Sequence, residues 1–377
     1  MKANGDFEIF LATAPGLEST LCDEVKANGF RAPKAIAGGV TIEGRWHDVW
    51  RANLVLRGAS RVLARLETFR VTRLDDLEAR AKRIPWTSVL RPDIPVRVEA
   101  TCRASRIYHS GAAAERIANA IRHVTRSPSA ADDAIGISVV ARIEKDRCTI
   151  SLDTTGELLH KRGFKEAVTK APLRETLAAL FLRQCGFTGR ESVVDPMCGS
   201  GTFVIEAAEI AAGLMPGRAR TFAFETLATF EAEAWQSLRD SKAAARTDPP
   251  PACRFYGSDR DAGAIAKSRA NAERAGVAGV TVFNHHPVSE LVAPDGAPGL
   301  VIVNPPYGAR LGDRKALTPL YRAFGQTILN RFAGWRVGLL TTDAALAKAT
   351  GLPFEPPAAP VPHGGLRVTL FRTPPLD

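Results

Sequence analysis

The chain has 377 residues, which at the roughly 150 residues of a typical domain predicts two or three domains. Apolar residues make up 45% and charged residues 24%, a composition that can bury a sizeable core and that excludes a globally disordered chain. The 50 Lys and Arg exceed the 40 Asp and Glu and leave a net charge of +10. This surplus favours an anionic partner, although solvated helix faces explain such a surplus equally well.

The basic excess is concentrated in the N-terminal part of the chain. Residues 1–165 contain 27 Lys and Arg against 20 Asp and Glu, a balance of +7, whereas residues 166–377 contain 23 against 20. Arginine predominates, and its planar guanidinium suits phosphate oxygens. The arginines in question are Arg51, Arg57, Arg61, Arg65, Arg70, Arg73, Arg80 and Arg83.

Cysteine usage and the absence of long apolar runs indicate the cellular setting. The six cysteines are far apart and include no C-x-x-C pair, which disfavours a metal site or a disulfide framework. The first residues include acidic side chains and a proline where a signal peptide needs an unbroken apolar stretch. No apolar run approaches the ~18 residues that span a membrane. We therefore expect a cytoplasmic protein without a metal or a membrane partner.

The first part of the chain mixes short strands and helices without regular alternation, which predicts a small α+β module. Helices are expected at 18–28, 46–56, 74–84 and 111–123. Strands are expected at 7–12, 39–43, 66–71, 96–100, 136–144 and 148–153.

The pattern changes after about residue 165. A long amphipathic helix is expected over 172–185, entered through a proline. Apolar strands then alternate with helices, which predicts an α/β domain with a doubly wound, mainly parallel sheet. These strands are expected at 193–194, 255–258, 280–283, 300–303, 337–341 and 366–371.

A glycine-rich turn follows the first of these strands and opens a helix over 203–212. Its sequence is DPMCGSGT (195–202), in which Gly199 and Gly201 let the backbone approach a ligand, and the helix N-terminus presents free N–H groups. A dinucleotide-binding turn would need a third glycine at the position of Val204. The turn therefore favours a nucleoside ligand that lacks a pyrophosphate.

The next strand ends in GSDRD (257–261). An acidic side chain at the carboxyl end of a strand can accept both ribose hydroxyls of a nucleoside, and Asp259 is the candidate for that role. The alternative is that Asp259 only caps the helix that begins at Ala262.

A third motif, NPPYG (304–308), follows the apolar strand at 300–303. Two consecutive prolines fix the backbone and leave carbonyl acceptors facing outward. The side-chain carbonyl of Asn304 and the backbone carbonyl of Pro305 could both accept hydrogen bonds from one exocyclic amino group. Tyr307 offers an aromatic face on which an extruded base can stack.

In this order, DPMCGSGT, GSDRD and NPPYG resemble the class I S-adenosylmethionine-dependent methyltransferases that modify exocyclic nitrogens. The segments SLDTTGELLHKRGF (151–164) and APLRETLA (171–178) narrow the resemblance to RNA guanine-N2 methyltransferases that carry a THUMP domain. The segment FAFETLATFEAEAW (222–235), inserted between the first two cofactor strands, also matches this family. The resemblance covers the chain from about residue 66 and, more loosely, a ferredoxin-like segment before it.

The resemblance implies four regions: a ferredoxin-like domain at 1–65, a THUMP RNA-binding domain at 66–155, a linker at 156–170 and a Rossmann-like methyltransferase domain at 171–377. It implies S-adenosylmethionine as cofactor, S-adenosylhomocysteine as product and RNA as partner of a monomeric enzyme. The implied catalytic residues are Asn304, Pro305, Pro306 and Tyr307. The implied cofactor-binding residues are Thr176, Asp195, Pro196, Gly199, Ser200, Gly201, Thr202, Asp259, Arg260, Asn284 and Asn304.

The chain departs from the family pattern at the third strand. Such enzymes have an Asp there that contacts the adenine amino group, whereas this chain reads VFNHHPVSE (282–290), so Asn284, a histidine or the backbone would have to supply the contact. The adjacent His285 and His286 suggest a metal, but no Cys or carboxylate cluster has ligand spacing with them, and a structural loop pair is favoured. Cys198 is interpreted as a packing residue of the glycine turn and not as a nucleophile.

The function expected is methyl transfer to guanine N2 in structured RNA, with 23S ribosomal RNA favoured and transfer RNA as the alternative. The basic N-terminal half would hold the RNA through its phosphates. DNA amino-methyltransferases and glutamine methyltransferases share the NPPY motif and are further rivals. A non-catalytic RNA-binding protein is the remaining alternative, supported by the missing third-strand Asp.

Overall fold

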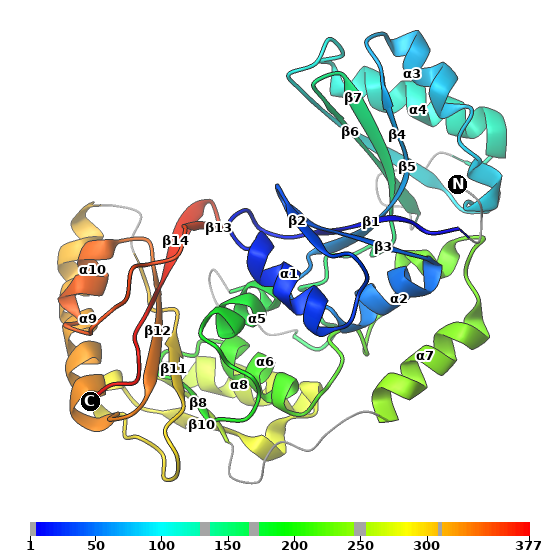
Figure 1. The fold of residues 1–377 in the computed structure, drawn as a ribbon. Helices are drawn as coiled ribbons and strands as arrows, with labels where there is room; N and C mark the ends of the chain where they lie inside the picture. The colour runs from blue at the N-terminus through cyan, green and yellow to red at the C-terminus, as the bar shows by residue number, and fades with distance from the viewer. Residues whose placement is uncertain (1–4, 129–135, 166–172, 245–253, 308–310) are drawn as a thin grey trace. The chain divides into compact units, whose positions relative to one another are not determined.

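The computed structural model describes residues 5–128, 136–165, 173–244, 254–307 and 311–377, the side chains of 311–314 excepted. The chain forms two compact units. The N-terminal unit comprises Met1–Thr13, Leu21–Leu159 and Arg220–Ser241, and the C-terminal unit comprises Ala14–Thr20, His160–Ala219 and Lys242–Asp377 (Figure 1). Among the described helices, none combines the length and the apolar character that crossing a membrane requires.

In its described residues, the N-terminal unit contains a seven-stranded sheet in the order β2-β3-β1-β4-β7-β6-β5. All neighbouring pairs are antiparallel except β5 and β6, which run parallel. The long strand β4 pairs with β1 on one side and with β7 on the other. The strands are β1 (Phe7–Ala12), β2 (Lys34–Ile36), β3 (Gly39–Gly44), β4 (Arg61–Arg70), β5 (Val96–Arg103), β6 (Ile137–Glu144) and β7 (Arg147–Asp153).

Helices of the N-terminal part form where apolar residues recur at helical spacing. The clearest example is α4 (Ser110–Thr125), which buries Ala113, Ile117, Ala120 and Ile121. These residues make one stripe along the helix, and α4 packs with it against β5 and α3. The other helices are α1 (Glu18–Ala27), α2 (Trp46–Val55) and α3 (Leu74–Ala81), with a short 3-10 turn η1 at Trp86–Ser88.

Within its described residues, the C-terminal unit contains a second seven-stranded sheet in the order β10-β9-β8-β11-β12-β14-β13. The pairs from β10 to β12 are parallel, and β14 and β13 are antiparallel additions at one side. The strands are β8 (Val193–Asp195), β9 (Phe255–Asp259), β10 (Thr281–His285), β11 (Leu300–Val303), β12 (Arg336–Thr341), β13 (Val361–His363) and β14 (Leu366–Arg372). The helices are α5 (Glu175–Gln184), α6 (Thr202–Ala211), α8 (Ala262–Ala275), α9 (Leu311–Arg331) and α10 (Ala344–Ala349), with 3-10 turns η3 (Ala278–Val280) and η4 (Val288–Glu290).

Both faces of this parallel sheet are covered, which explains why its central strand is apolar throughout. Every residue of β11 is fully buried. Val301 and Val303 belong to the core that α9 fills with Phe324 and Ile328. The opposite face is tight enough that a Cβ atom on Gly338 would lie 2.7 Å from Cys185 Sγ, at the end of α5.

The inserted segment packs in the N-terminal unit, although its neighbours in sequence belong to the C-terminal one. It contains the 3-10 turn η2 (Ala223–Thr226) and α7 (Ala232–Ala244). The ring of Phe224 lies 6.2 Å from that of Trp50 and 5.1 Å from that of Trp235. Phe222 and Phe230 complete this aromatic cluster.

The expected fold class, an α+β region followed by a doubly wound α/β region, is confirmed. The short strands β2 and β13 were not expected, and β4 begins at Arg61 rather than at residue 66. The helix expected over 74–84 ends at Ala81, and its chain leads into Pro85, which disfavours further helix. The helix expected from residue 172 begins only at Glu175, because Arg174 is extended and serves as its N-cap. The exact domain boundaries stay a prediction.

Candidate functional site

The predicted site residues follow neighbouring parallel strands of the C-terminal sheet. β8 ends at Asp195, β9 ends at Asp259, and Asn304 follows β11 directly. Of the four parallel strands β8 to β11, the first in sequence is β8. It pairs with β9 on one side and with β11 on the other, so the strand order reverses at β8. Ligands of doubly wound folds bind at such a switch point, outside the carboxyl ends of the strands.

Asp195 is a buried carboxyl group with few compensating contacts. It is 3% exposed, and its Oδ1 accepts a hydrogen bond from the Met197 N–H at 3.1 Å. Burial raises its pKa to about 8, and the nearby charge of Asp259 acts in the same direction. Among the residues that the structure describes, no cation forms an ion pair with it. At this pKa the carboxyl is largely protonated near neutral pH, and a positively charged ligand group placed here would favour its ionised form.

The glycine turn is held in place by α8. Gly199 and Gly201 have φ values of +55° and +85°, which L side chains rarely adopt. Ser268 Oγ donates to the Gly199 carbonyl at 2.9 Å, and Asn271 Nδ2 donates to the Ser200 carbonyl at 3.1 Å. A Cβ atom on Gly201 would lie 3.1 Å from Ser268 Oγ, a tight contact, so packing within the protein also favours glycine there.

Cys198 of this turn is buried against α8 and β9. Its N–H donates to the Ser258 carbonyl at 2.9 Å, and its Sγ lies 3.8 Å from Ser268 Oγ. Burial holds the pKa of the thiol well above its usual range, so the group is protonated. These contacts support a packing role and not that of a nucleophile.

Asp259 connects the glycine turn to β9. One of its oxygens accepts from the Gly199 N–H at 3.0 Å and the other from the Asp261 N–H at 3.0 Å. The N-cap of α8 is Asp261, whose side chain accepts from the Gly263 N–H at 2.8 Å, so the interpretation of Asp259 as that cap is wrong. A carboxylate has about four acceptor positions, which leaves Asp259 capacity for two hydroxyls.

The end of β10 has no acidic side chain. Asn284 is exposed there, beside Ser258 of β9. His285 Nε2 lies 3.0 Å from the Arg260 carbonyl, and His286 Nδ1 lies 3.1 Å from the Pro287 carbonyl. Within the described ranges, no group of three or more His, Cys, Asp or Glu has the arrangement of a metal site.

Asn304 contains an orphaned polar atom. Its Oδ1 is buried and has no hydrogen-bond partner among the residues that the structure describes. Leaving a buried acceptor unpaired costs about 1–3 kcal/mol, so such an atom indicates a missing donor. Pro305 beside it is buried, and Tyr307 is partly buried, which raises the pKa of its phenol to about 12. Gly308 lies outside the described residues.

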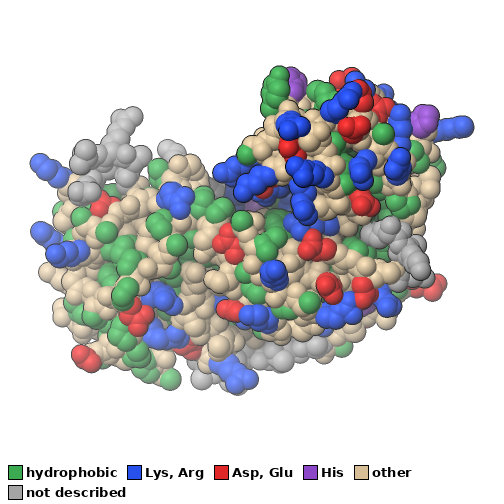
Figure 2. Space-filling view, turned by 45° about the horizontal axis from the view of Figure 1, so that its top comes forward, with side chains coloured by type: hydrophobic (Ala, Val, Ile, Leu, Met, Phe, Trp, Pro, Cys, Tyr) green, Lys and Arg blue, Asp and Glu red, His purple; other side chains and the backbone are tan. Residues whose placement is uncertain are grey.

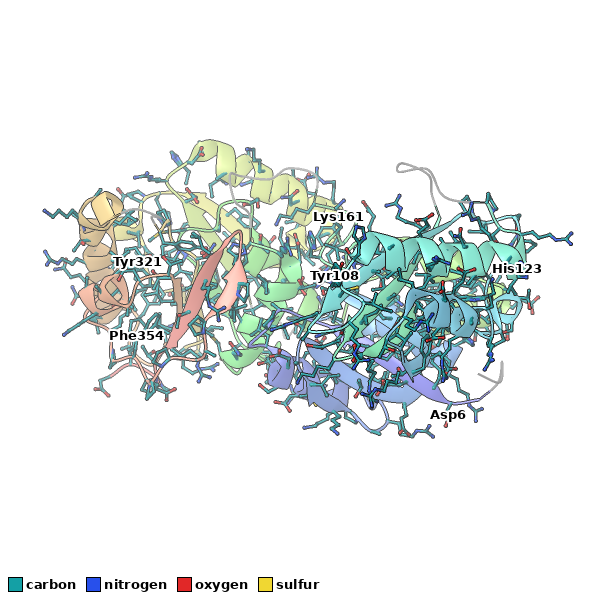
Figure 3. All side chains as sticks on the ribbon, turned by 90° about the horizontal axis from the view of Figure 1, so that it is seen from above. Asp6, Tyr108, His123, Lys161, Tyr321 and Phe354 are labelled. Carbon is teal, nitrogen blue, oxygen red and sulfur yellow. The ribbon has the colours of Figure 1, made fainter. Side chains whose placement is uncertain are left out.

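Tyr321 of α9 positions this loop, and it was not among the predicted site residues. Its side chain is 1% exposed, and its Oη lies 3.3 Å from both the Pro306 carbonyl and Thr341 Oγ1. In the sequence it belongs to an ordinary apolar stripe with Phe324 and Ile328. Figure 3 labels Tyr321. Only the fold places it beneath the two prolines.

A buried ion pair beside the glycine turn was also missed. Lys165 Nζ lies 2.8 Å from Glu175 Oε1. It also donates a hydrogen bond at 2.8 Å to Oγ1 of Thr202, which is the first residue of α6. The two charged side chains are 10% and 8% exposed. Thr176, the next residue of α5, is 4% exposed. The sequence contains Lys165 after HKRGF and Glu175 in LRETLA, but no pattern in the sequence indicates that the two side chains form an ion pair.

The HKRGF stretch is fixed on the helices that carry the site. Arg162 Nη2 lies 3.3 Å from Glu206 Oε1 of α6, and both side chains are 1% exposed. Arg274 Nε of α8 donates to the Phe164 carbonyl at 2.8 Å. Because α6 begins at the glycine turn, these contacts couple the stretch to the turn.

A pocket of about 370 Å³ lies elsewhere in the C-terminal unit. It is lined by Leu300 and Arg336, the first residues of β11 and β12, and by Glu355 and Arg372. β11 and β12 are parallel, so their amino ends lie together, at the opposite end of the strands from the candidate site. None of the predicted site residues lines this pocket.

Three family models match the chain in succession. Residues 8–63 match the RlmL ferredoxin-like domain, and residues 71–153 match the THUMP domain. Residues 162–355 match the RMKL-like methyltransferase domain.

Individual relatives agree with these matches. The chain is 36% identical over 352 residues to the ribosomal RNA large subunit methyltransferase K/L of Psychromonas ingrahamii, which covers 91% of this chain and 47% of that protein. The chain thus spans about half the length of this curated relative. Among solved structures, a possible methylase from Clostridium difficile 630 has a TM-score of 0.89 and 29% identity, with 99% of each chain covered. SMU.472, assigned as a methyltransferase and complexed with SAH, has a TM-score of 0.88 and 26% identity, again over 99% of each chain.

Proposed function

Since the chain belongs to the RMKL-like methyltransferase family, we propose that it transfers a methyl group from S-adenosylmethionine to the exocyclic N2 of a guanosine in structured RNA. The favoured substrate is 23S ribosomal RNA, as the name of the Psychromonas relative suggests. The observation that carries the proposal is the buried Oδ1 of Asn304 after β11, which no described residue satisfies with a hydrogen bond. An amino group of a base is the donor that this atom lacks.

The residues at the strand ends fit S-adenosylmethionine. Asp259 has acceptor capacity for the two ribose hydroxyls, and the poorly compensated Asp195 suits the ammonium of the methionine part. Lys165, held at the start of α6, suits the carboxylate of the same part. The SAH in the related SMU.472 structure supports this cofactor. The adenine contact is assigned to Asn284 or to the backbone of β10.

The cofactor supplies an activated methyl group on a sulfonium, so the chain's own contribution is positioning. Asn304 Oδ1 and the Pro305 carbonyl would accept the two hydrogens of the amino group and direct its lone pair. They would also stabilise positive charge that develops on the nitrogen. As the new N–C bond forms, the S–C bond breaks, and the surplus proton leaves to solvent. Tyr307, whose phenol is protonated at neutral pH, would stack on the extruded base.

Methylation assays on purified RNA test this proposal. The protein is incubated with S-adenosylmethionine and either unmodified 23S ribosomal RNA or transfer RNA, and nucleosides are identified by mass spectrometry. N2-methylguanosine in the ribosomal RNA is the expected product. N6-methyladenosine, N4-methylcytidine or modification of transfer RNA alone would overturn the substrate assignment.

Calorimetry separates an enzyme from a non-catalytic RNA-binding protein. We expect S-adenosylmethionine to bind in the micromolar range, since the charged and hydroxyl-binding residues are already in place. No binding in that range would contradict the proposed activity.

A further inference from the structure

One end of the N-terminal sheet collects basic side chains from several strands. β4 ends at Arg70, β5 ends at Arg103, and the β6–β7 hairpin turns at Lys145. Arg147 opens β7 and lies opposite Arg70. The register therefore places these four residues together. With the loop that follows β5, they form a surface that we call the basic tip: Arg70, Arg103, Arg106, Tyr108, Lys145 and Arg147.

The basic tip carries an exposed aromatic ring. Tyr108 is 84% exposed, more than any other large hydrophobic residue described (Figure 3). The backbone on either side of it is anchored, because Ile107 is buried and His109 caps α4 through a hydrogen bond from the Ala112 N–H at 3.0 Å. The ring therefore contributes little to the packing of the described residues.

The loop that holds Tyr108 is fixed to the neighbouring hairpin. The Arg106 N–H donates to Asp146 Oδ1 at 2.8 Å, and the Asp146 N–H donates to Ser105 Oγ at 3.0 Å. The Lys145 N–H donates to the Arg103 carbonyl at 3.2 Å. A ring presented from a fixed loop loses little conformational entropy when a ligand covers it.

The basic tip keeps a net positive charge, because its five Lys and Arg outnumber Glu144 and Asp146, the acidic residues that lie among them in the register. Arg70, Arg103, Lys145 and Arg147 are exposed, and within the described residues they form no ion pair. Arg106 Nε lies 4.0 Å from Asp146 Oδ2, which makes a weak ion pair. Figure 2 shows many Lys and Arg side chains, with Asp and Glu side chains among them, on one face of the molecule. The tip thus presents one aromatic face surrounded by cations suited to phosphates.

We propose that the basic tip binds an unpaired nucleotide of RNA, with Tyr108 stacked on the base and the surrounding arginines on the flanking phosphates. A base in a duplex has both faces covered, whereas an unpaired base offers a face to the ring. The ring stands alone among cations rather than in an apolar patch, which favours a nucleotide over a protein surface. The inference rests on the proposed function only in that the partner is RNA.

Anisotropy of labelled RNA tests the role of the ring. The probes are a short single-stranded oligoadenylate and a blunt RNA duplex of equal length. Stacking contributes about 1–3 kcal/mol per base, so Tyr108→Ala should weaken oligoadenylate binding by about 5- to 150-fold. Duplex binding should stay unchanged. Tyr108→Phe keeps the ring and should bind like the unmodified protein, and so should Leu329→Ala, which removes an exposed apolar side chain of α9.

Two further readouts address stacking and charge directly. A 2-aminopurine placed in the oligoadenylate should be quenched by the unmodified protein and by Tyr108→Phe, and not by Tyr108→Ala. Arg147→Gln should reduce the salt dependence of oligoadenylate binding by about 0.7 in log–log slope, as loss of one phosphate contact requires. Circular dichroism and SAH affinity of every variant should match the unmodified protein.

The outcomes separate this inference from the proposed function. If Tyr108→Ala binds oligoadenylate as tightly as the unmodified protein does, the basic tip is not a nucleotide site. The same conclusion follows if Tyr108→Ala loses as much affinity for the duplex as for oligoadenylate. An unmodified protein that binds oligoadenylate through Tyr108 but methylates no RNA contradicts the proposed function and supports the tip.

Discussion

Burial of the Asp195 carboxyl at the end of β8 makes stability depend on pH. Its pKa is raised from 3.8 to about 8, so between these values the folded protein holds a proton that the unfolded chain releases. The stabilisation is complete below about pH 4 and is lost as pH rises through about 8. In the ligand-free protein, the free energy of unfolding of the C-terminal unit should therefore fall over that range.

Replacing Asp195 by Asn should remove this contribution to the pH dependence. Urea denaturation of both proteins at several pH values measures the effect, with signals from the C-terminal unit. If the free energy of unfolding changes equally with pH in Asp195→Asn and in the unmodified protein, another group causes the pH dependence. If the carboxylate accepts the cofactor's ammonium, SAH binding at neutral pH should also release a proton, which calorimetry in two buffers detects.

Asn304 should matter for turnover and little for cofactor affinity. Asn304→Ala removes the orphaned Oδ1, and loss of one transition-state hydrogen bond of this kind typically lowers turnover by about 10²–10³-fold. SAH affinity, measured by calorimetry, should remain nearly intact. A large loss of SAH affinity would instead place Asn304 in the cofactor pocket.

Lys165 should recognise one end of the cofactor. Lys165→Met removes the ammonium beside Thr202 and should lower SAH affinity by about 10- to 150-fold, the range for hydrogen bonds to charged groups. Methylthioadenosine lacks the amino-acid carboxylate, so both proteins should bind it equally. Equal losses for both ligands would show that Lys165 only supports the fold.

At the scale of elements, the glycine turn depends on backbone conformations that other residues rarely adopt. Gly201→Ala forces a Cβ into φ +85° and to 3.1 Å from Ser268 Oγ, and we expect a loss of about 1–3 kcal/mol in unfolding free energy together with weaker SAH binding. Gly279→Ala is the matched control, because its Cβ would meet nothing within 4 Å. Thermal unfolding and calorimetry compare the two. A Gly201→Ala protein as stable as Gly279→Ala would contradict the role of the turn.

Strand β4 shows what sequence patterning could and could not reveal. Val62, Ala64 and Leu66 alternate inward as a strand requires, but Arg61 before them and Arg65 among them obscured the first half of the strand. Their partners are Asp153 and Glu8, far away in the sequence. The three-residue strands β2 and β13 are too short for any alternation to be recognised.

The motifs were predictable because their chemistry is local, whereas their supports were not. DPMCGSGT and NPPY each carry their signal within a few residues after an apolar strand. Lys165 reaches Thr202, and Tyr321 reaches Pro306, only through the tertiary fold. The roles assigned to the motif residues remain predictions that the experiments above address.

At the scale of the whole molecule, the aromatic cluster should stabilise the N-terminal unit. Trp235 is 4% exposed and packs on Phe224, so Trp235→Ala should cost about 3–5 kcal/mol. Hydrogen exchange should show lost protection in β4 and β7. Trp335→Ala, in the core of the C-terminal unit, should act on β11 and β12 instead. Equal effects of Trp235→Ala on the two sheets would contradict the assignment of 220–241 to the N-terminal unit.

This assignment has a consequence for synthesis on the ribosome. The N-terminal sheet is complete once Leu159 has emerged, but the segment that closes its aromatic core ends only at Ser241. At about 5–20 residues per second, the nascent unit waits about 4–16 seconds with Trp50 uncovered. A chaperone that binds exposed aromatic side chains would therefore meet this protein during that interval.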